Sequence, residues 1–191
     1  MPFNEVFFGK GHRFAMEIEN IGVHASKRWE LYMPKRYADK NKTGDKWAIC
    51  YGHVEGGDVE PRIITEDMEF TEPECHNIMM LDMDSKAKWL RKKIKVPVTT
   101  YMFTGLILLT MNAGQGNVAK GRVLTFLNRE KYVSAGAAFM DHRYKWEKVL
   151  NEEGKPAINA DTGKPLLQRV EDNGLIMRRG FEISIFGTKK D

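Results

Sequence analysis

The residues best suited to chemistry in this sequence are cations interleaved with aromatic rings. They gather in the segment KRWELYMPKRYADKNKTGDK, residues 27–46. Cations neutralise phosphates while aromatic faces stack on unpaired bases, so this pattern is typical of proteins that bind single-stranded nucleic acid. The candidate binding residues of this first patch are Lys27, Arg28, Trp29, Lys35, Arg36 and Tyr37.

A second group of positive charges follows in the segment SKAKWLRKKIK. Asp84 or Ser85 can cap a helix here, because a short oxygen-bearing side chain accepts a hydrogen bond from a first-turn amide. Ala87, Leu90 and Ile94 would share its apolar face. The charged face could meet water, an acidic protein surface or phosphate, and its candidate binding residues are Lys88, Arg91, Lys92 and Lys95.

Metal chemistry has weaker support. Two cysteines and two histidines could be drawn into a zinc site: Cys50, His53, Cys75 and His76. Their spacing departs from the C-x-x-C and H-x-x-x-H patterns that structural zinc usually takes. The acidic residues between positions 66 and 84 are better read as a solvated edge than as ligands of divalent cations. We therefore expect no metal and no cofactor, with both cysteines as free buried thiols.

A glycine-rich stretch offers an outline of a nucleotide-binding motif. Gly114, Gly116 and Ala119 spell G-x-G-x-x-A after an apolar run. That fingerprint requires a helix next, so that its amides meet the pyrophosphate, whereas the residues that follow are β-like and broken by Gly121. We therefore favour a hairpin turn over a nucleotide-binding loop at Gly114 and Gly116. Since the sequence also has no G-x-S-x-G motif and no Walker loop, we expect a protein that is not an enzyme.

The composition is that of an ordinary globular protein. The chain has 191 residues, of which 42% are hydrophobic and 29% charged, and its net charge is +4. These values exclude wholesale disorder and permit an anionic partner without requiring one. The polar residues in MPFNEVFFGKG argue against a signal peptide, and the run from Tyr101 to Met111 is shorter than the ~18 apolar residues that cross a bilayer. We expect a protein without a membrane partner, located in the cytoplasm or assembled into a virus particle.

Hydrophobic patterns predict a mainly β chain of the α+β class, with one packed helix at about residues 84–95. Alternating or unbroken apolar runs predict strands, whereas residues 133–140 stay open between a helix and a strand. Asn173-Gly174 predicts a tight hairpin turn. The predicted strands include residues 14–18, 47–51, 62–65, 76–83, 98–111, 122–127 and 181–185.

These elements predict an antiparallel sandwich or barrel that forms a single domain over residues 1–191. Residues 151–168 are polar and rich in turns, so we expect a long C-terminal hairpin arm that projects from the body. A strand leading into an aspartate-capped helix, followed by a long hairpin and a terminal alternating strand, resembles the plan of phage tail-tube and related ring-forming proteins.

Two functional hypotheses follow. The first is a non-enzymatic structural or assembly protein that forms a homo-oligomer, such as a component of a phage virion, because hairpin arms generally rest on a partner. The second is a β-barrel protein that binds single-stranded nucleic acid through the two basic patches. Self-association is thus the expected partner interaction, and nucleic acid is the alternative.

Overall fold

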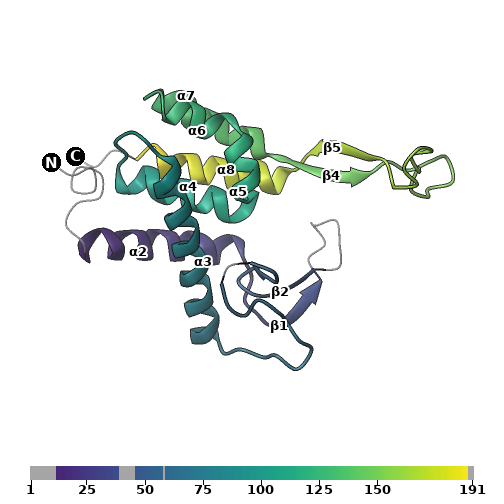
Figure 1. Cartoon of the computed structure of the whole chain (residues 1–191), viewed down its shortest axis with the longest axis horizontal. Coiled ribbons are helices and arrows are strands. Elements are labelled where there is room, and N and C mark those ends of the chain that lie inside the picture. Colours follow the sequence, from purple (N-terminus) through teal and green to yellow (C-terminus); the bar gives the residue numbers. More distant parts are fainter. Residues whose placement is uncertain (1–11, 39–45, 58, 189–191) are drawn as a thin grey trace.

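The computed structural model describes residues 12–38, 46–57 and 59–188, with side chains from residue 21 onward. Figure 1 shows a small sheet lying below a group of helices, a long helix α3 that connects the two, and a two-stranded arm that extends to one side. We call the sheet and its loops the β lobe (described residues between 33 and 71). The helical lobe comprises α4 to α8 with α2 packed against α4.

The secondary structure is dominated by helices. They are α2 (His12–Trp29), α3 (Glu72–Lys93), α4 (Thr100–Ala113), α5 (Gln115–Lys120), α6 (Arg122–Leu127), α7 (Tyr132–Ala137), the 3-10 helix η1 (Ala138–His142) and α8 (Asn173–Phe186). Strands β1 (Met33–Ala38), β2 (Trp47–Cys50) and β3 (His53–Val54) form an antiparallel sheet in that order. Strands β4 (Tyr144–Lys148) and β5 (Leu167–Glu171) form a separate antiparallel pair.

This architecture shows that the predicted mainly β sandwich or barrel with a single helix is wrong. Most of the predicted strands are helical: residues 14–18 lie in α2, 76–83 in α3, 122–127 in α6 and 181–185 in α8. The predicted hairpin turn at Asn173-Gly174 is instead the start of α8, where Asp172 caps the helix by accepting a hydrogen bond from Leu175 N at 2.9 Å. Short apolar runs do not distinguish a strand from a buried helix.

Helix α4 shows why the longest apolar run misled the prediction. Residues 98–111 were expected to form a strand, yet Thr99 caps a helix by accepting a hydrogen bond from Met102 N at 3.1 Å. Helices α2, α3 and α8 all pack on α4, so its side chains are buried on several faces and no polar stripe marks the helical period. Gly105 permits the close approach of α8, because a Cβ there would lie 3.0 Å from the Cβ of Phe186.

Helix α3 begins at Glu72, well before the predicted start near residue 84. Thr71 and Glu74 form a capping box, in which Thr71 N donates to Glu74 Oε2 at 2.7 Å. The segment HNIMMLDM is therefore part of the apolar stripe of a helix. The buried residues of α3 repeat at three- and four-residue spacing: Cys75, Ile78, Met79, Met83, Ala87 and Leu90.

That stripe contributes to two hydrophobic clusters. The first half of α3 packs with β2 in the β lobe, through Cys75, Ile78 and Met79. The second half packs in the helical lobe with residues of α4 and the short helices, through Met83, Ala87 and Leu90. One rigid helix therefore sets the position of the β lobe relative to the helical lobe.

A disulfide reinforces the attachment of the β lobe. Cys50 of β2 is bonded to Cys75 of α3, with Cα atoms 4.9 Å apart, so the expectation of two free thiols is wrong. Both residues are buried, and neither thiol is available to a metal. In the part of the chain that the structure describes, no cluster of three metal-ligating side chains occurs. Within the same ranges, no helix is long and apolar enough to cross a membrane.

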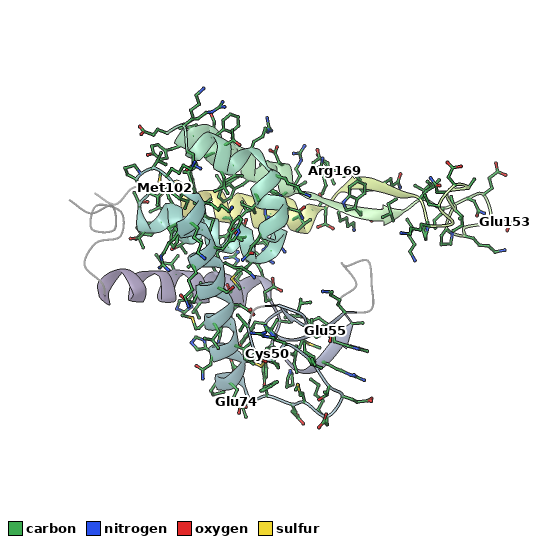
Figure 2. The ribbon with its side chains drawn as sticks, in the orientation of Figure 1. Cys50, Glu55, Glu74, Met102, Glu153 and Arg169 are labelled. Atoms are coloured by element: carbon green, nitrogen blue, oxygen red, sulfur yellow. A yellow bond between two sulfur atoms is a disulfide. The ribbon has the colours of Figure 1, made fainter. Side chains whose placement is uncertain are left out.

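Strands β4 and β5 form the base of the arm. Their last pair is Lys148 with Leu167, and isolated bridges continue the pairing further out, between Leu150 and Pro156 and between Ile158 and Pro165. Figure 2 shows Arg169 near the helices and Glu153 at the far end, well away from the rest of the molecule. The arm leaves the body on the same side as the sheet (Figure 1).

Candidate functional site

Glu30 lies where α2 ends beside the β lobe. Its backbone N donates to Ser26 O at 2.9 Å, so it continues the last helical turn. Its side chain is 28% exposed, and Oε1 accepts a hydrogen bond from Nη1 of Arg178 in α8 at 2.6 Å. A partly exposed carboxylate is thus held in place between the two lobes.

The second oxygen of Glu30 faces Gly52, in the turn between β2 and β3. Gly52 has a φ of +78°, and a Cβ at this position would lie 3.1 Å from Glu30 Oε2. A larger residue would strain the backbone and crowd the carboxylate. Gly52 therefore keeps one side of Oε2 open.

A buried ionic cluster supports Arg178 from behind. Glu182 Oε1 lies 3.3 Å from Arg178 Nε and 2.9 Å from Arg179 Nη2, and Arg179 also donates to Asn112 Oδ1 of α4 at 2.7 Å. Burial raises the pKa of Glu182 to about 7 and lowers that of Arg179 to about 10, although the opposite charge of each partner works against both shifts. The cluster ties α8 to α4 and fixes the guanidinium that binds Glu30.

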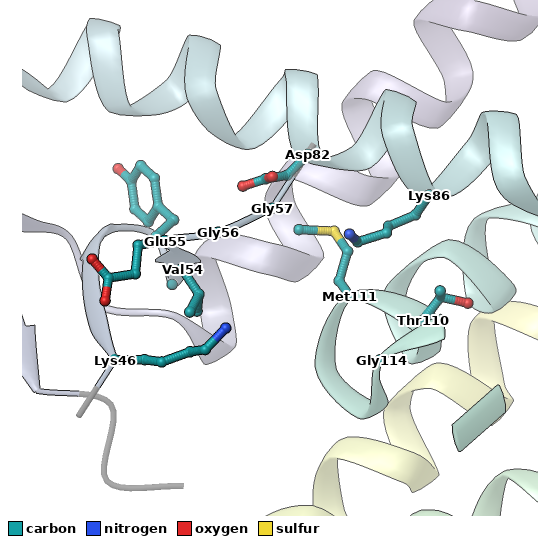
Figure 3. A pocket seen from close by; sticks show the side chains of 12 residues that line it. Lys46, Val54, Glu55, Gly56, Gly57, Asp82, Lys86, Thr110, Met111 and Gly114 are labelled. Atoms are coloured by element: carbon teal, nitrogen blue, oxygen red, sulfur yellow. The ribbon is translucent and has the colours of Figure 1, made fainter. Parts of the chain in front are cut away.

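A pocket of about 230 Å³ opens between the β lobe and the helices α3 and α4 (Figure 3). Gly52 and Glu55 line it from the β lobe, whereas Asp82, Lys86 and Met111 line it from the helices. Glu30 itself does not line this space, but its Oε2 is next to Gly52, which does.

His53 and Asp82 hold the two walls of the pocket together. His53 is buried in β3, with Nδ1 2.8 Å from Asp82 Oδ2 and Nε2 2.9 Å from Pro61 O. Burial disfavours the charged imidazole, but the hydrogen bond and negative charge of Asp82 outweigh it and raise the pKa of His53 above 6.5. Acceptors at both ring nitrogens favour the doubly protonated form, which binds β3 to α3.

Three of the four cations of the first predicted patch form ion pairs with acids of the fold. The pairs are Lys27 with Glu72 at 2.8 Å, Lys35 with Glu69 at 3.4 Å and Arg36 with Glu66 at 3.3 Å. These bridges attach the end of α2 and strand β1 to the segment that leads into α3.

The remaining members of that patch pack against rings or within the sheet. The guanidinium of Arg28 lies 5.3 Å from the ring centroid of Phe181, and the ring of Trp29 lies 6.2 Å from the same centroid. Tyr37 is half-buried in β1, opposite Ala48. The two aromatic residues are therefore not presented as a stacking platform.

Three residues of the second predicted patch lie on α3, and Lys95 follows the end of that helix. Lys88 pairs with Asp84 at 2.7 Å and Arg91 lies 5.5 Å from the ring centroid of Phe103, whereas Lys92 and Lys95 are exposed. At about 1.5 Å per residue, Lys88 stands about 24 Å along the helix from the end that meets the first patch. The fold does not bring the two patches together.

Glu30 is absent from the residues that sequence reasoning selected. The one available signal was its setting, because it is the single acid between Glu19 and Asp39, in a segment with four cations. Its partner Arg178 is 148 positions away, and no spacing rule reaches that far.

Comparison with known proteins decides the family. The phage lysozyme family matches residues 27–156, a range that contains Glu30 and the residues lining the pocket. The chain belongs to the phage lysozyme family. Helix α8, which supplies Arg178, lies beyond the matched range, so the partner of Glu30 comes from a separate part of the sequence.

Solved structures share the fold of this lysozyme family member at low identity. The muramidase domain of SpmX from Asticaccaulis excentricus has a TM-score of 0.68 and 20% identity, covering 90% of this chain and 98% of that one. The endolysin of Escherichia coli O157:H7 phage FAHEc1 has a TM-score of 0.67 and 22% identity, covering 95% and 96%. A lysozyme mutant of phage P22 has a TM-score of 0.60 and 21% identity, covering 88% and 96%. Among curated proteins, none matches the sequence.

Membership of a lysozyme family overturns both functional hypotheses. The chain is not a non-enzymatic assembly protein of the tail-tube kind, and it is not a nucleic-acid-binding barrel. The expectation of a protein without enzymatic activity failed because it relied on nucleophile and nucleotide motifs. Glycoside hydrolysis needs only correctly placed carboxyl groups, which leave no compact motif in the sequence.

Proposed function

We propose that this protein hydrolyses the glycosidic bonds of peptidoglycan, with Glu30 as the general acid. The observation that carries the proposal is the carboxylate of Glu30, held through Oε1 by Arg178, with Oε2 next to Gly52, which lines the pocket. Membership of the phage lysozyme family supports it. The shared fold with a muramidase domain and a phage endolysin agrees with it.

The geometry suits proton donation. Cleavage of a glycosidic bond requires a proton on the leaving oxygen, and a carboxylic acid beside the sugar chain supplies it. Arg178, whose side chain is 9% exposed, fixes the orientation of Glu30 and leaves Oε2 toward the substrate side.

A second carboxylate would stabilise the positive charge that develops on the sugar or activate the attacking water. Glu182 is unsuited to this role, because it is buried behind Arg178. Asp39 and Asp45 lie in the link between β1 and β2, outside the described residues, and are the nearest carboxylates after Glu30 in the sequence. We propose that this link supplies the second group.

The test is hydrolysis of purified peptidoglycan, followed by loss of turbidity and by release of reducing sugar ends. Glu30→Gln keeps the shape of the side chain but removes the acid, so activity should fall by at least about 100-fold, the usual contribution of a general acid. The single variants Asp39→Asn and Asp45→Asn identify the second group, since only one of them should lose activity to a similar extent.

The matched control is Glu66→Gln, which removes a surface carboxylate of the β lobe outside the pocket. It should retain activity close to that of the wild type. Full activity in the Glu30→Gln variant, with an unchanged circular dichroism spectrum, would rule out Glu30 as the acid.

A further inference from the structure

A lysine of the β lobe and a lysine of α3 line the same pocket. Lys46 directly precedes β2, and Lys86 lies on α3. Both line the pocket, and Figure 3 shows their side chains reaching toward its interior from opposite sides. Both lie in the basic segments that the sequence patterns singled out, although neither is among the candidate binding residues chosen from them.

The acids of the pocket do not neutralise these lysines. Glu55 accepts a hydrogen bond from Trp47 N at 3.3 Å, and Asp82 is bound to His53 at 2.8 Å. Within the described residues, neither lysine ammonium has a carboxylate at ion-pair distance. The charge of Lys86 lowers the pKa of His53, which places the ammonium close enough to the His53–Asp82 pair to act on it.

The surroundings of both lysines favour a small anionic group. The Nζ of Lys46 lies 3.5 Å from the position of a Cβ on Gly56, so the ammonium rests against a turn that has no side chain there. With a volume of about 230 Å³, the pocket has space for a small side group of a polymer. Lysine presents a compact point charge that suits a carboxylate approaching from several directions.

We propose that Lys46 and Lys86 bind a carboxylate carried by the sugar chain of the substrate. The inference rests on the proposed function, because a polymer of N-acetylated amino sugars without acidic substituents is uncharged and offers two cations no partner. The muramic acid unit of peptidoglycan carries a lactyl carboxyl group, which is either free or joined to a peptide stem with carboxylates of its own. The two lysines thus distinguish peptidoglycan from an uncharged glycan of the same length.

The test compares binding of three soluble fragments by calorimetry in the Glu30→Gln chain. The fragments are chitotetraose, which is uncharged, a peptide-free muramyl tetrasaccharide, and the same tetrasaccharide with peptide stems. The double variant Lys46→Gln/Lys86→Gln should bind at least one of the acidic fragments about tenfold more weakly and chitotetraose equally well. If the double variant binds the peptide-free fragment more weakly, the lysines bind the lactyl carboxylate. If only the fragment with peptide stems is bound more weakly, they bind a carboxylate of the peptide.

Two controls separate charge from structure. Lys46→Arg/Lys86→Arg keeps both charges and should restore binding, and Lys92→Gln removes an exposed cation of the same helix without effect. The proposal would be overturned if the glutamine double variant bound each fragment as tightly as the parent chain does. It would also be overturned if the double variant bound all three fragments more weakly by the same factor. Binding does not depend on hydrolysis, so this result stands apart from the test of Glu30 as the acid.

Discussion

Glu30 and Arg178 are 148 positions apart in the chain and 2.6 Å apart in the fold. Oε1 of Glu182 accepts hydrogen bonds from both Arg178 and the fully buried Arg179. A buried charge that loses its partner is strongly destabilising, so this cluster holds its members in one arrangement. At the scale of single residues, the orientation of the candidate acid thus depends on a buried ionic cluster behind Arg178.

The pair of His53 and Asp82 makes stability depend on pH. The pKa of His53 is raised in the folded state, so the folded chain binds this proton more tightly than the unfolded chain does. The stabilisation is therefore complete below about pH 6.5 and is lost as the pH rises through the raised pKa. We expect the free energy of unfolding to decrease on the alkaline side of pH 6.5.

Asp82→Asn should remove most of that decrease and cost about 2 kcal/mol at pH 6, the value of a hydrogen bond to a charged group. Urea unfolding at pH 5.5, 7 and 9 measures both effects. Asp84→Asn is the control, because its pair with Lys88 is exposed on the same helix. An unchanged pH dependence in Asp82→Asn would show that another group titrates in this range.

Helix α3 is the element on which the site depends. Its first half packs in the β lobe, its second half packs in the helical lobe, and Asp82 and Lys86 line the pocket between them. The capping box at Thr71 and Glu74 fixes where this helix begins. A shift of α3 would therefore move one wall of the pocket relative to the other.

The disulfide between Cys50 and Cys75 closes a loop with a sequence separation of 25. Closing a loop of this size restricts the unfolded chain, so reduction should lower the free energy of unfolding by about 3 kcal/mol. Urea unfolding with and without reductant measures the loss. The Cys50→Ser/Cys75→Ser variant should show the lower stability in both conditions, and equal stability of oxidised and reduced wild type would contradict the expectation.

The arm is the part of the whole molecule that contributes least to either lobe. It exposes apolar side chains, with Trp146 67%, Leu150 60% and Ile158 54% exposed. Exposed apolar surface of this kind is typical of contact with a partner. Self-association and the location of the protein in the cell remain predictions.

Replacement of residues 149–166 by Asn-Gly tests the independence of the arm. Lys148 and Leu167 are paired, so a two-residue turn can join them directly. The free energy of unfolding should change by less than about 0.5 kcal/mol, because the removed segment is mainly exposed. Chemical unfolding measures this change, and a loss of several kcal/mol would show that the arm supports the lobes. Size-exclusion chromatography with light scattering on the same samples reports whether the arm mediates self-association.

Local features of the sequence were enough for some elements and misleading for others. Alternation at Trp47 and Ile49 corresponds to β2, and the shared face of Ala87 and Leu90 corresponds to the second half of α3. The run in α4 was ambiguous, because a helix covered by neighbours on several faces shows no polar stripe. The helical signals that were present were the caps at Thr99 and Asp172. The first was outweighed by the apolar run that follows it, and the second by the hairpin signal of Asn173-Gly174.

The sequence by itself determined the composition, the local caps and the apolar faces, because these depend on residues within a few positions of one another. The tertiary structure alone decided that Glu30 lies against Arg178 and Gly52, and that Lys46 and Lys86 line one pocket. It also decided that most of the cations in the first basic patch are paired within the fold. Charge pairing, burial and the shape of a pocket arise from segments far apart in the chain, so no local pattern encodes them.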